Sequence, residues 1–206
     1  MDAPTSQFYD RYIDEGAIRN EAAQSATSAY FERAFKAGGK VLDVGAGSGR
    51  DLALLRDMGF DAYGLEPNEA MRAFALRTHP GLAGRLQPGA LPAIGSPFGG
   101  GFDGIVCSAV LMHIPAADLP RCAASFRLLV KPQGRLLFSV PCLRADLLDG
   151  ERDPDGRFFE NHDTEELALH FGKAGFSLID RWDKGEFADT RWLVLLFEKD
   201  ADAAQS

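Results

Sequence analysis

Long hydrophobic runs are missing from this sequence. No segment approaches the roughly 18 continuous apolar residues that a membrane span requires. The first residues, Met1 to Thr5, supply neither the basic region nor the apolar region of a secretory signal. We therefore expect a protein that binds no membrane and has a cytoplasmic location.

Cysteine is scarce, and its three residues, Cys107, Cys122 and Cys142, lie far apart. An odd number of distant cysteines is typical of a reduced cytosolic protein and not of a disulfide framework. No CxxC pair is present, and no cluster of Cys, His and Asp has the spacing of metal ligands. We expect no metal ion in the functional site.

Basic residues are outnumbered by acidic ones. The 22 Lys and Arg face 30 Asp and Glu, which gives a net charge of −8. Nucleic-acid binders normally carry a basic surface that displaces counterions from phosphates, so the balance argues against that class. The acidic surface and small size favour a small-molecule partner. We expect a monomer or a weak homodimer.

The 206 residues have the length of a single domain. Residues 1–38 are expected to be helical, with Phe8, Tyr9, Tyr12 and Ile13 at helical spacing and an Ala-rich stretch from Glu21 to Ala37. Residues 39–200 form the expected core domain. Residues 201–206 are small and polar and are expected to be disordered.

The core alternates short apolar strands with helices of about ten residues, which predicts a parallel sheet with helices on both faces. The last two strands, Phe176 to Trp182 and Arg191 to Glu198, have no helix between them and should form an antiparallel hairpin. The fold class is therefore α/β, a doubly wound, Rossmann-like sheet. The other expected strands are 41–44, 60–65, 85–87, 102–108 and 135–140, and the expected helices are 48–58, 69–78, 116–129 and 164–174.

The clearest local signal is a glycine-rich turn, Gly45-Ala-Gly-Ser-Gly49, between the first core strand and a helix. Glycines allow a sharp turn and close approach of a ligand to the helix amino-terminus. Glu66 follows Gly45 by 21 residues, the spacing at which an acidic side chain reaches the ribose of a bound nucleoside. Together the two features predict a nucleoside-containing cofactor.

The sequence resembles class I S-adenosylmethionine-dependent methyltransferases. The resemblance covers about residues 40–199 and implies a seven-stranded sheet whose seventh strand is antiparallel. It implies methyl transfer from S-adenosylmethionine to a small-molecule acceptor by in-line displacement. The matching segments are Leu42-Asp-Val-Gly-Ala-Gly-Ser-Gly-Arg50, Gly64-Leu-Glu-Pro67, Leu91-Pro92, Phe102 to Pro115 and Leu129 to Leu137.

The resemblance also assigns roles around the cofactor. Asp43 is expected to hold the glycine turn by hydrogen bonds, and Glu66 to accept both ribose hydroxyls. The acid that many members carry before Leu-Pro is missing here, so backbone groups of Ala90 and Leu91 are expected to bind the adenine. The remaining expected contacts are Gly45, Ala46 and Gly47 with the methionine part, Pro67 with the adenine, and Ser108 and Ala109 beneath the sulfonium.

In similar enzymes the amino-terminal helix folds over the cofactor as a cap. Tyr9 and Tyr12 can then cover the sulfonium by cation–π contact. Arg19 can pair with the methionine carboxylate, as can Arg11. The alternative is that the aromatic residues only form the buried stripe of the helix.

His113 follows the fourth core strand and is the candidate catalytic base, because imidazole accepts protons near neutrality. The alternative is a histidine that only shapes the pocket. The loop from Pro141 to Asn161 is expected to be a mobile lid over the acceptor, or else an ordinary surface loop. Its candidate contacts are Phe158 and Phe159 for apolar groups and Arg144 and Arg157 for anions, with Arg191 approaching from the terminal hairpin.

Two other classes share parts of this pattern. A nicotinamide-dependent oxidoreductase has the turn and the acid, but it usually carries GxGxxG, whereas Arg50 occupies the last position here. A non-catalytic S-adenosylmethionine-binding module would keep the turn and lack an open acceptor pocket.

Overall fold

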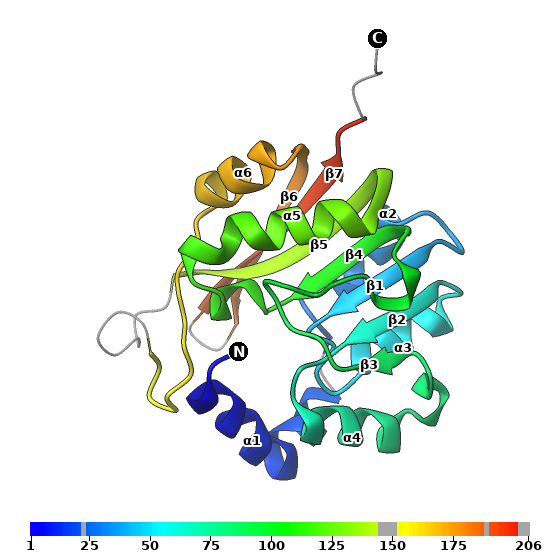
Figure 1. The fold of residues 1–206 in the computed structure, drawn as a ribbon. Helices are drawn as coiled ribbons and strands as arrows, with labels where there is room; N and C mark the ends of the chain where they lie inside the picture. The colour runs from blue at the N-terminus through cyan, green and yellow to red at the C-terminus, as the bar shows by residue number, and fades with distance from the viewer. Residues whose placement is uncertain (22–23, 144–151, 188–189, 202–206) are drawn as a thin grey trace.

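The structure is a computed structural model that describes residues 1–21, 24–143, 152–187 and 190–201. Its centre is one seven-stranded sheet with the order β3-β2-β1-β4-β5-β7-β6. The pairs among β1 to β5 are parallel, and β7 is antiparallel to both β5 and β6. The doubly wound α/β prediction with an antiparallel terminal hairpin is therefore confirmed (Figure 1). The strands are β1 (Lys40–Val44), β2 (Asp61–Leu65), β3 (Leu86–Gln87), β4 (Phe102–Ser108), β5 (Val130–Leu143), β6 (Phe176–Phe187) and β7 (Thr190–Lys199).

Helices cover both faces of the sheet, because the strand residues alternate between two apolar clusters. Leu42, Ile105 and Phe138 pack with α5 and α6 on one face. The neighbouring Val41 and Val106 pack with α2 and α3 on the other. The α-helices are α1 (Ala3–Glu21), α2 (Phe31–Ala34), α3 (Arg50–Asp57), α4 (Glu69–Thr78), α5 (Leu119–Leu129) and α6 (Thr164–Lys173), and the short 3₁₀ turns include η1 (Ser28–Tyr30), η4 (Leu111–His113) and η5 (Ala116–Asp118).

The expected Ala-rich helix over residues 21–37 is wrong. Helix α1 ends at Glu21, and the described part of the stretch contains only η1 and the four-residue α2. The hydroxyl of Ser25 accepts a hydrogen bond from the Ser28 amide at 3.0 Å. Serine and threonine side chains that bond nearby backbone groups compete with helix formation.

The terminal hairpin is longer than predicted. Strand β6 continues to Phe187 and β7 begins at Thr190, so two residues connect them where the sequence pattern indicated eight. The extension is polar and lacks apolar alternation, but backbone pairing carries it past an irregularity between Asp183 and Glu186. Strand β5 likewise extends to Leu143, so the expected loop over 141–161 begins later.

Helix α1 and the segment Arg152–Asp163, called the strap below, lie at the end of the sheet toward which the arrows of β1 and β4 point (Figure 1). Ligands of doubly wound sheets bind at this carboxyl edge. Residues 144–151, which include Arg144, and residues 202–206, which cover most of the expected disordered tail, lie outside the described residues.

Candidate active site at the carboxyl edge of the sheet

The glycine-rich turn is fastened to the neighbouring strand. The amides of Gly45 and Ala46 both donate to the carbonyl of Leu65, at 2.8 and 2.9 Å. Gly45 has a φ of 78°, and a Cβ added there would overlap Cγ2 of Val110, which follows β4. Only glycine therefore combines this backbone conformation with contact between the turn and the end of β4.

Glu66 is buried and closes on the turn. Its Oε2 accepts from the Gly47 amide at 2.9 Å, and its Oε1 accepts from the Asn68 amide at 2.8 Å. Burial raises the pKa of Glu66, while these two amides act in the opposite direction. Each carboxylate oxygen keeps further lone-pair sites for a diol.

Asp43 is the one polar side chain in the described residues with a fully buried atom that lacks a hydrogen-bond partner. That atom is Oδ2, and the residue is 2% exposed. Burial raises the pKa of Asp43 well above its ordinary value, and the charges of Asp51 and Glu66 raise it further. The expected hydrogen bonds to the turn are not made by Oδ2. A buried acceptor without a partner costs free energy unless a ligand supplies a donor.

The end of β4 is held by a residue that the sequence pattern did not single out, Ser139 on β5. Its Oγ accepts from the Ala109 amide at 2.9 Å and lies 3.1 Å from Oγ of Ser108. Ala109 has a φ of 57°, which is unusual for a residue other than glycine. Such strain is retained where the surroundings impose it and is frequent at functional sites.

The loop after β3 presents backbone at this edge. Leu91 is buried in the core cluster, whereas Ala90 is only partly buried. Pro67 is also partly buried, and its carbonyl accepts from Arg72 at 2.7 Å. Leu91 and Pro92 also line a cavity at this edge, so the loop offers side-chain as well as backbone atoms to a ligand.

Asn68 joins helix α1 to the site and was missed by the sequence pattern. Its Oδ1 caps α4 by accepting from the Met71 amide, and its Nδ2 donates to Oδ1 of Asp10 at 2.7 Å. The Asn68 amide also donates to Glu66, as described above. The side chain and backbone amide of Asn68 therefore link Glu66, α4 and α1. An Asn before a helical segment is a typical N-cap, which is the signal that could have found it.

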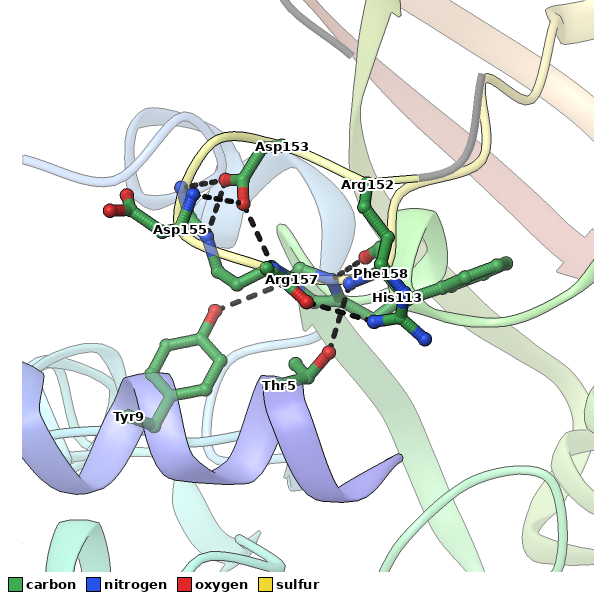
Figure 2. Close-up of polar contacts among 9 residues, drawn as sticks. Thr5, Tyr9, His113, Arg152, Asp153, Asp155, Arg157 and Phe158 are labelled. Carbon is green, nitrogen blue, oxygen red and sulfur yellow. Dashed lines mark hydrogen bonds and ion pairs between the residues drawn. The ribbon is translucent and has the colours of Figure 1, made fainter. Parts of the chain in front are cut away.

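Tyr9 reaches from α1 to His113 at the end of η4. Its Oη lies 3.2 Å from Nε2 of His113, while Nδ1 of His113 lies 2.6 Å from the carbonyl oxygen of Phe158 (Figure 2). Burial raises the pKa of Tyr9 and lowers that of His113 to about 4. His113 is therefore neutral near pH 7, and both ring nitrogens are engaged.

Tyr12 and Arg19 also lie on α1. The Tyr12 ring packs against Phe8, with ring centroids 5.5 Å apart, and against Tyr9 at 6.1 Å. This aromatic cluster is partly buried, and it includes Tyr9, which contacts His113. The side chain of Arg19 is not among those that the structure describes.

The strap places Arg157, Phe158 and Phe159 beside His113. Arg157 is paired with the buried carboxylate of Asp153, with Nε 2.8 Å from Oδ2, and its guanidinium lies 4.1 Å from the Phe8 ring centroid. The charge expected to meet an anionic acceptor is therefore already compensated. Phe159 is 2% exposed and packs on the His113 ring at 4.7 Å.

Arg191 is the second residue of β7 and lies opposite Leu143 of β5. Its guanidinium is exposed and pairs with Asp183, with Nε 2.8 Å from Oδ2. This partner lies on β6, so the guanidinium is engaged within the terminal hairpin.

A cavity of about 320 Å³ opens between the two residues that precede α1, the loop after β3, the η4–η5 segment and the strap. This volume falls at the lower end of the range for small-molecule sites, which is roughly 300–1,000 Å³. None of the described Lys or Arg side chains lines it. The lining residues are Met1, Asp2, Leu91, Pro92, His113, Ile114, Pro115, Asp118 and Phe158.

Several other chemistries find no support in the described ranges. No three His, Cys, Asp or Glu side chains there are grouped to hold a metal ion. Cys107 is fully buried, and burial raises its pKa well above the ordinary value, which makes it a poor nucleophile. None of the helices in this part of the chain has the length and apolar character needed to cross a membrane.

Comparison with known proteins gives the class. The sequence model of a protein family described as "Methyltransferase domain" matches residues 16–180. The chain therefore belongs to this family. It is a class I S-adenosylmethionine-dependent methyltransferase, as the resemblance in sequence predicted, and S-adenosylmethionine is its cofactor. No curated protein matches the chain significantly.

Solved structures share the fold over nearly the whole chain. The CcbJ methyltransferase from Streptomyces caelestis has a TM-score of 0.73 and 18% identity, with 97% of this chain and 100% of that chain covered. A Burkholderia thailandensis 1,6-didemethyltoxoflavin-N1-methyltransferase, solved with its substrate and S-adenosylhomocysteine, has a TM-score of 0.65 and 24% identity, with 95% and 84% covered. The [4+2]-cyclase SpnF has a TM-score of 0.71 and 18% identity, with 98% and 99% covered.

Proposed function

We propose that this protein transfers the methyl group of S-adenosylmethionine to a small-molecule acceptor bound between α1, η4 and the strap. The observation that carries the proposal is the contact between Gly47 and Glu66, which joins the glycine turn to a buried carboxylate at the carboxyl edge. The cavity of about 320 Å³ beside His113 supports an acceptor of small-molecule size. The 1,6-didemethyltoxoflavin-N1-methyltransferase, which was solved with the small molecule 1,6-didemethyltoxoflavin bound, is similar in fold.

The residues present fit the cofactor. Glu66 would accept the ribose hydroxyls, because its carboxylate is already oriented by two amides. The unpartnered Oδ2 of Asp43 would gain a donor, directly or through water, from the methionine amino group. Pro67 and the backbone of Ala90 and Leu91 would contact the adenine. The remaining contacts are proposed for Gly45, Ala46 and Gly47 along the methionine part, and for Ser108 and Ala109 beneath the sulfonium.

Bound S-adenosylmethionine supplies a methyl group on a positively charged sulfur that is already a good leaving group. The protein then has to align the acceptor with the methyl–sulfur bond and exclude water, and alignment alone is worth about 7–11 kcal/mol. Helix α1 and the strap would act as the cover. Tyr9 would turn its ring and hydroxyl oxygen toward the reaction centre from that cover.

Aligning the acceptor and excluding water require no proton transfer by His113. Its pKa of about 4 makes it a weak base in the state described, and Tyr9 already occupies Nε2. We propose that His113 contributes by holding Tyr9, and that any proton released by the acceptor leaves through water.

The first test is calorimetry with S-adenosylhomocysteine and, separately, NAD. We expect binding of the first and none of the second. Glu66→Gln should weaken binding, whereas Glu69→Gln, an exposed acid in the first turn of α4, should not. Failure of S-adenosylhomocysteine to bind would refute the proposed function.

The second test identifies the acceptor. Purified protein is incubated with a metabolite extract and S-adenosylmethionine labelled in its methyl group, and labelled products are identified by mass spectrometry. A labelled small molecule is expected. Tight S-adenosylhomocysteine binding without any labelled product in extracts of the source cells would instead indicate a non-catalytic binding module.

A further inference from the structure

Asp153 organises the turn of the strap although it lies outside the cavity lining. The residue is 2% exposed. Its Oδ1 accepts from the amides of Asp155 and Arg157, at 3.1 and 2.9 Å, and its Oδ2 accepts from Nε of Arg157 at 2.8 Å. A buried carboxylate with three donors closes the turn between residues 153 and 157 (Figure 2). The backbone bridge between Arg152 and Phe158 continues from this turn.

The closed turn fixes the position of Phe158 at both ends of its backbone. The Phe158 amide donates to Oγ1 of Thr5 on α1 at 3.0 Å, and the Phe158 carbonyl accepts from Nδ1 of His113 at 2.6 Å. Arg152 also pairs with Asp2 at 2.6 Å, so the strap and α1 hold one another. The carbonyl of Phe158 consequently has one direction, toward His113.

The Phe158 carbonyl sets the direction of the hydrogen bonds that join Tyr9, His113 and Phe158. A carbonyl oxygen only accepts, so Nδ1 of His113 carries the hydrogen. In the neutral ring Nε2 then has a lone pair, and the hydroxyl of Tyr9 donates to it. The Tyr9 oxygen has given its hydrogen away, and it accepts from the guanidinium of Arg157. Burial raises the pKa of Tyr9, and this hydrogen bond acts in the opposite direction.

We propose that Asp153 is a positioning residue that, through the Phe158 carbonyl, fixes the tautomer of His113 and so makes Nε2 of His113 the acceptor for the Tyr9 hydroxyl. This inference does not depend on the proposed function.

The tautomer is measured by ¹⁵N NMR of the His113 ring in the full chain. Wild-type protein should show a protonated Nδ1 and an unprotonated Nε2. Asp153→Ala should produce a mixture of tautomers, because the Phe158 carbonyl is no longer held toward Nδ1 of His113. Asp153→Asn keeps an acceptor for the two backbone amides and should retain the wild-type tautomer. Asp155→Asn changes an exposed acid in the same turn and is the matched control.

Two results would overturn the positioning role. One is a protonated Nε2 in the wild type. The other is an unchanged tautomer of His113 in a folded Asp153→Ala protein, with folding verified by circular dichroism. Calorimetry with S-adenosylhomocysteine on the same samples separates this inference from the proposed function, because Asp153→Ala should retain binding within about threefold.

Discussion

The backbone amide of Gly47 donates to Oε2 of Glu66 across 2.9 Å, although 19 residues separate them. The parallel pairing of β1 and β2, with Val44 opposite Leu65, brings the ends of the two strands to the same level. The turn after β1 and the acid after β2 therefore meet without any other element between them. The proposed nucleoside end of the cofactor site is therefore already assembled without a ligand, which lowers the cost of ordering it on binding.

Glu66→Gln should weaken S-adenosylhomocysteine binding by about 1.5–3 kcal/mol, the range for hydrogen bonds to a charged group. Glutamine keeps one acceptor oxygen and replaces the other with an NH2 group. Its side chain therefore cannot accept from the Gly47 and Asn68 amides through two separate oxygens. Calorimetry measures the difference, with Glu69→Gln as control. Equal affinity in the Glu66 variant would remove Glu66 from the ribose site.

Asp43→Asn should have opposite effects on the free and bound protein. Near neutral pH the free protein should gain about 1 kcal/mol in unfolding free energy, because an unpaired buried carboxylate is removed. Since the pKa of Asp43 is raised, its ionisation costs stability at high pH and this cost vanishes as the pH falls. The stabilisation by S-adenosylhomocysteine should shrink. Thermal melts with and without S-adenosylhomocysteine measure both effects. An equal loss of stability in the free and the bound protein would contradict the proposed contact between Asp43 and the ligand.

Gly45→Ala should destabilise the protein more than Gly59→Ala. Both glycines have positive φ, 78° and 87°, so each alanine carries a backbone strain of about 1–2 kcal/mol. Only Gly45 has Val110 in the space that the Cβ needs, and Gly59 has no atom within 4 Å of that position. Overpacking adds about 1–3 kcal/mol. Denaturant unfolding of the two variants isolates this second contribution, and equal losses would show that Val110 moves aside freely.

Acid should destabilise the fold through His113. Its pKa is about 4 in the folded protein and near 6.5 when unfolded, so the unfolded chain takes up the proton first. The contribution of His113 to the free energy of unfolding is fully present above about pH 6.5. It is lost as the pH falls from about 6.5 to about 4, and the loss is at most about 3 kcal/mol. His113→Asn should flatten this part of the stability curve. Unfolding free energies of both proteins between pH 4 and 7 provide the comparison.

The residues proposed to bind the cofactor could be predicted from the sequence, because their positions follow from local rules. Gly45, Gly47 and Glu66 sit directly after consecutive parallel strands, and strand ends of this kind meet at one edge. Asn68 lies two residues beyond Glu66 and was missed, since its contact with Asp10 depends on where α1 packs. The spacing of polar residues contains no information about that packing.

The expectations for the acceptor side depended on charge and residue type, and there the structure changed the interpretation. Arg157 looked available for an anion, but Asp153, four residues earlier, takes up its guanidinium. Phe159 looked available for a ligand, but it is buried against His113. A loop sequence does not reveal which side of a turn faces inward when the turn is closed by its own side chains.

The sequence by itself determined the doubly wound sheet, the antiparallel hairpin, the glycine turn and the acid that closes on it. These depend on strand periodicity and on short spacings within one βαβ unit. The tertiary structure alone decided that Tyr9, His113 and Phe158 form one chain of hydrogen bonds. Tyr9 and His113 are 104 residues apart, and His113 and Phe158 are 45 apart. Such contacts arise from the packing of α1 and the strap on the finished sheet, which no local pattern specifies.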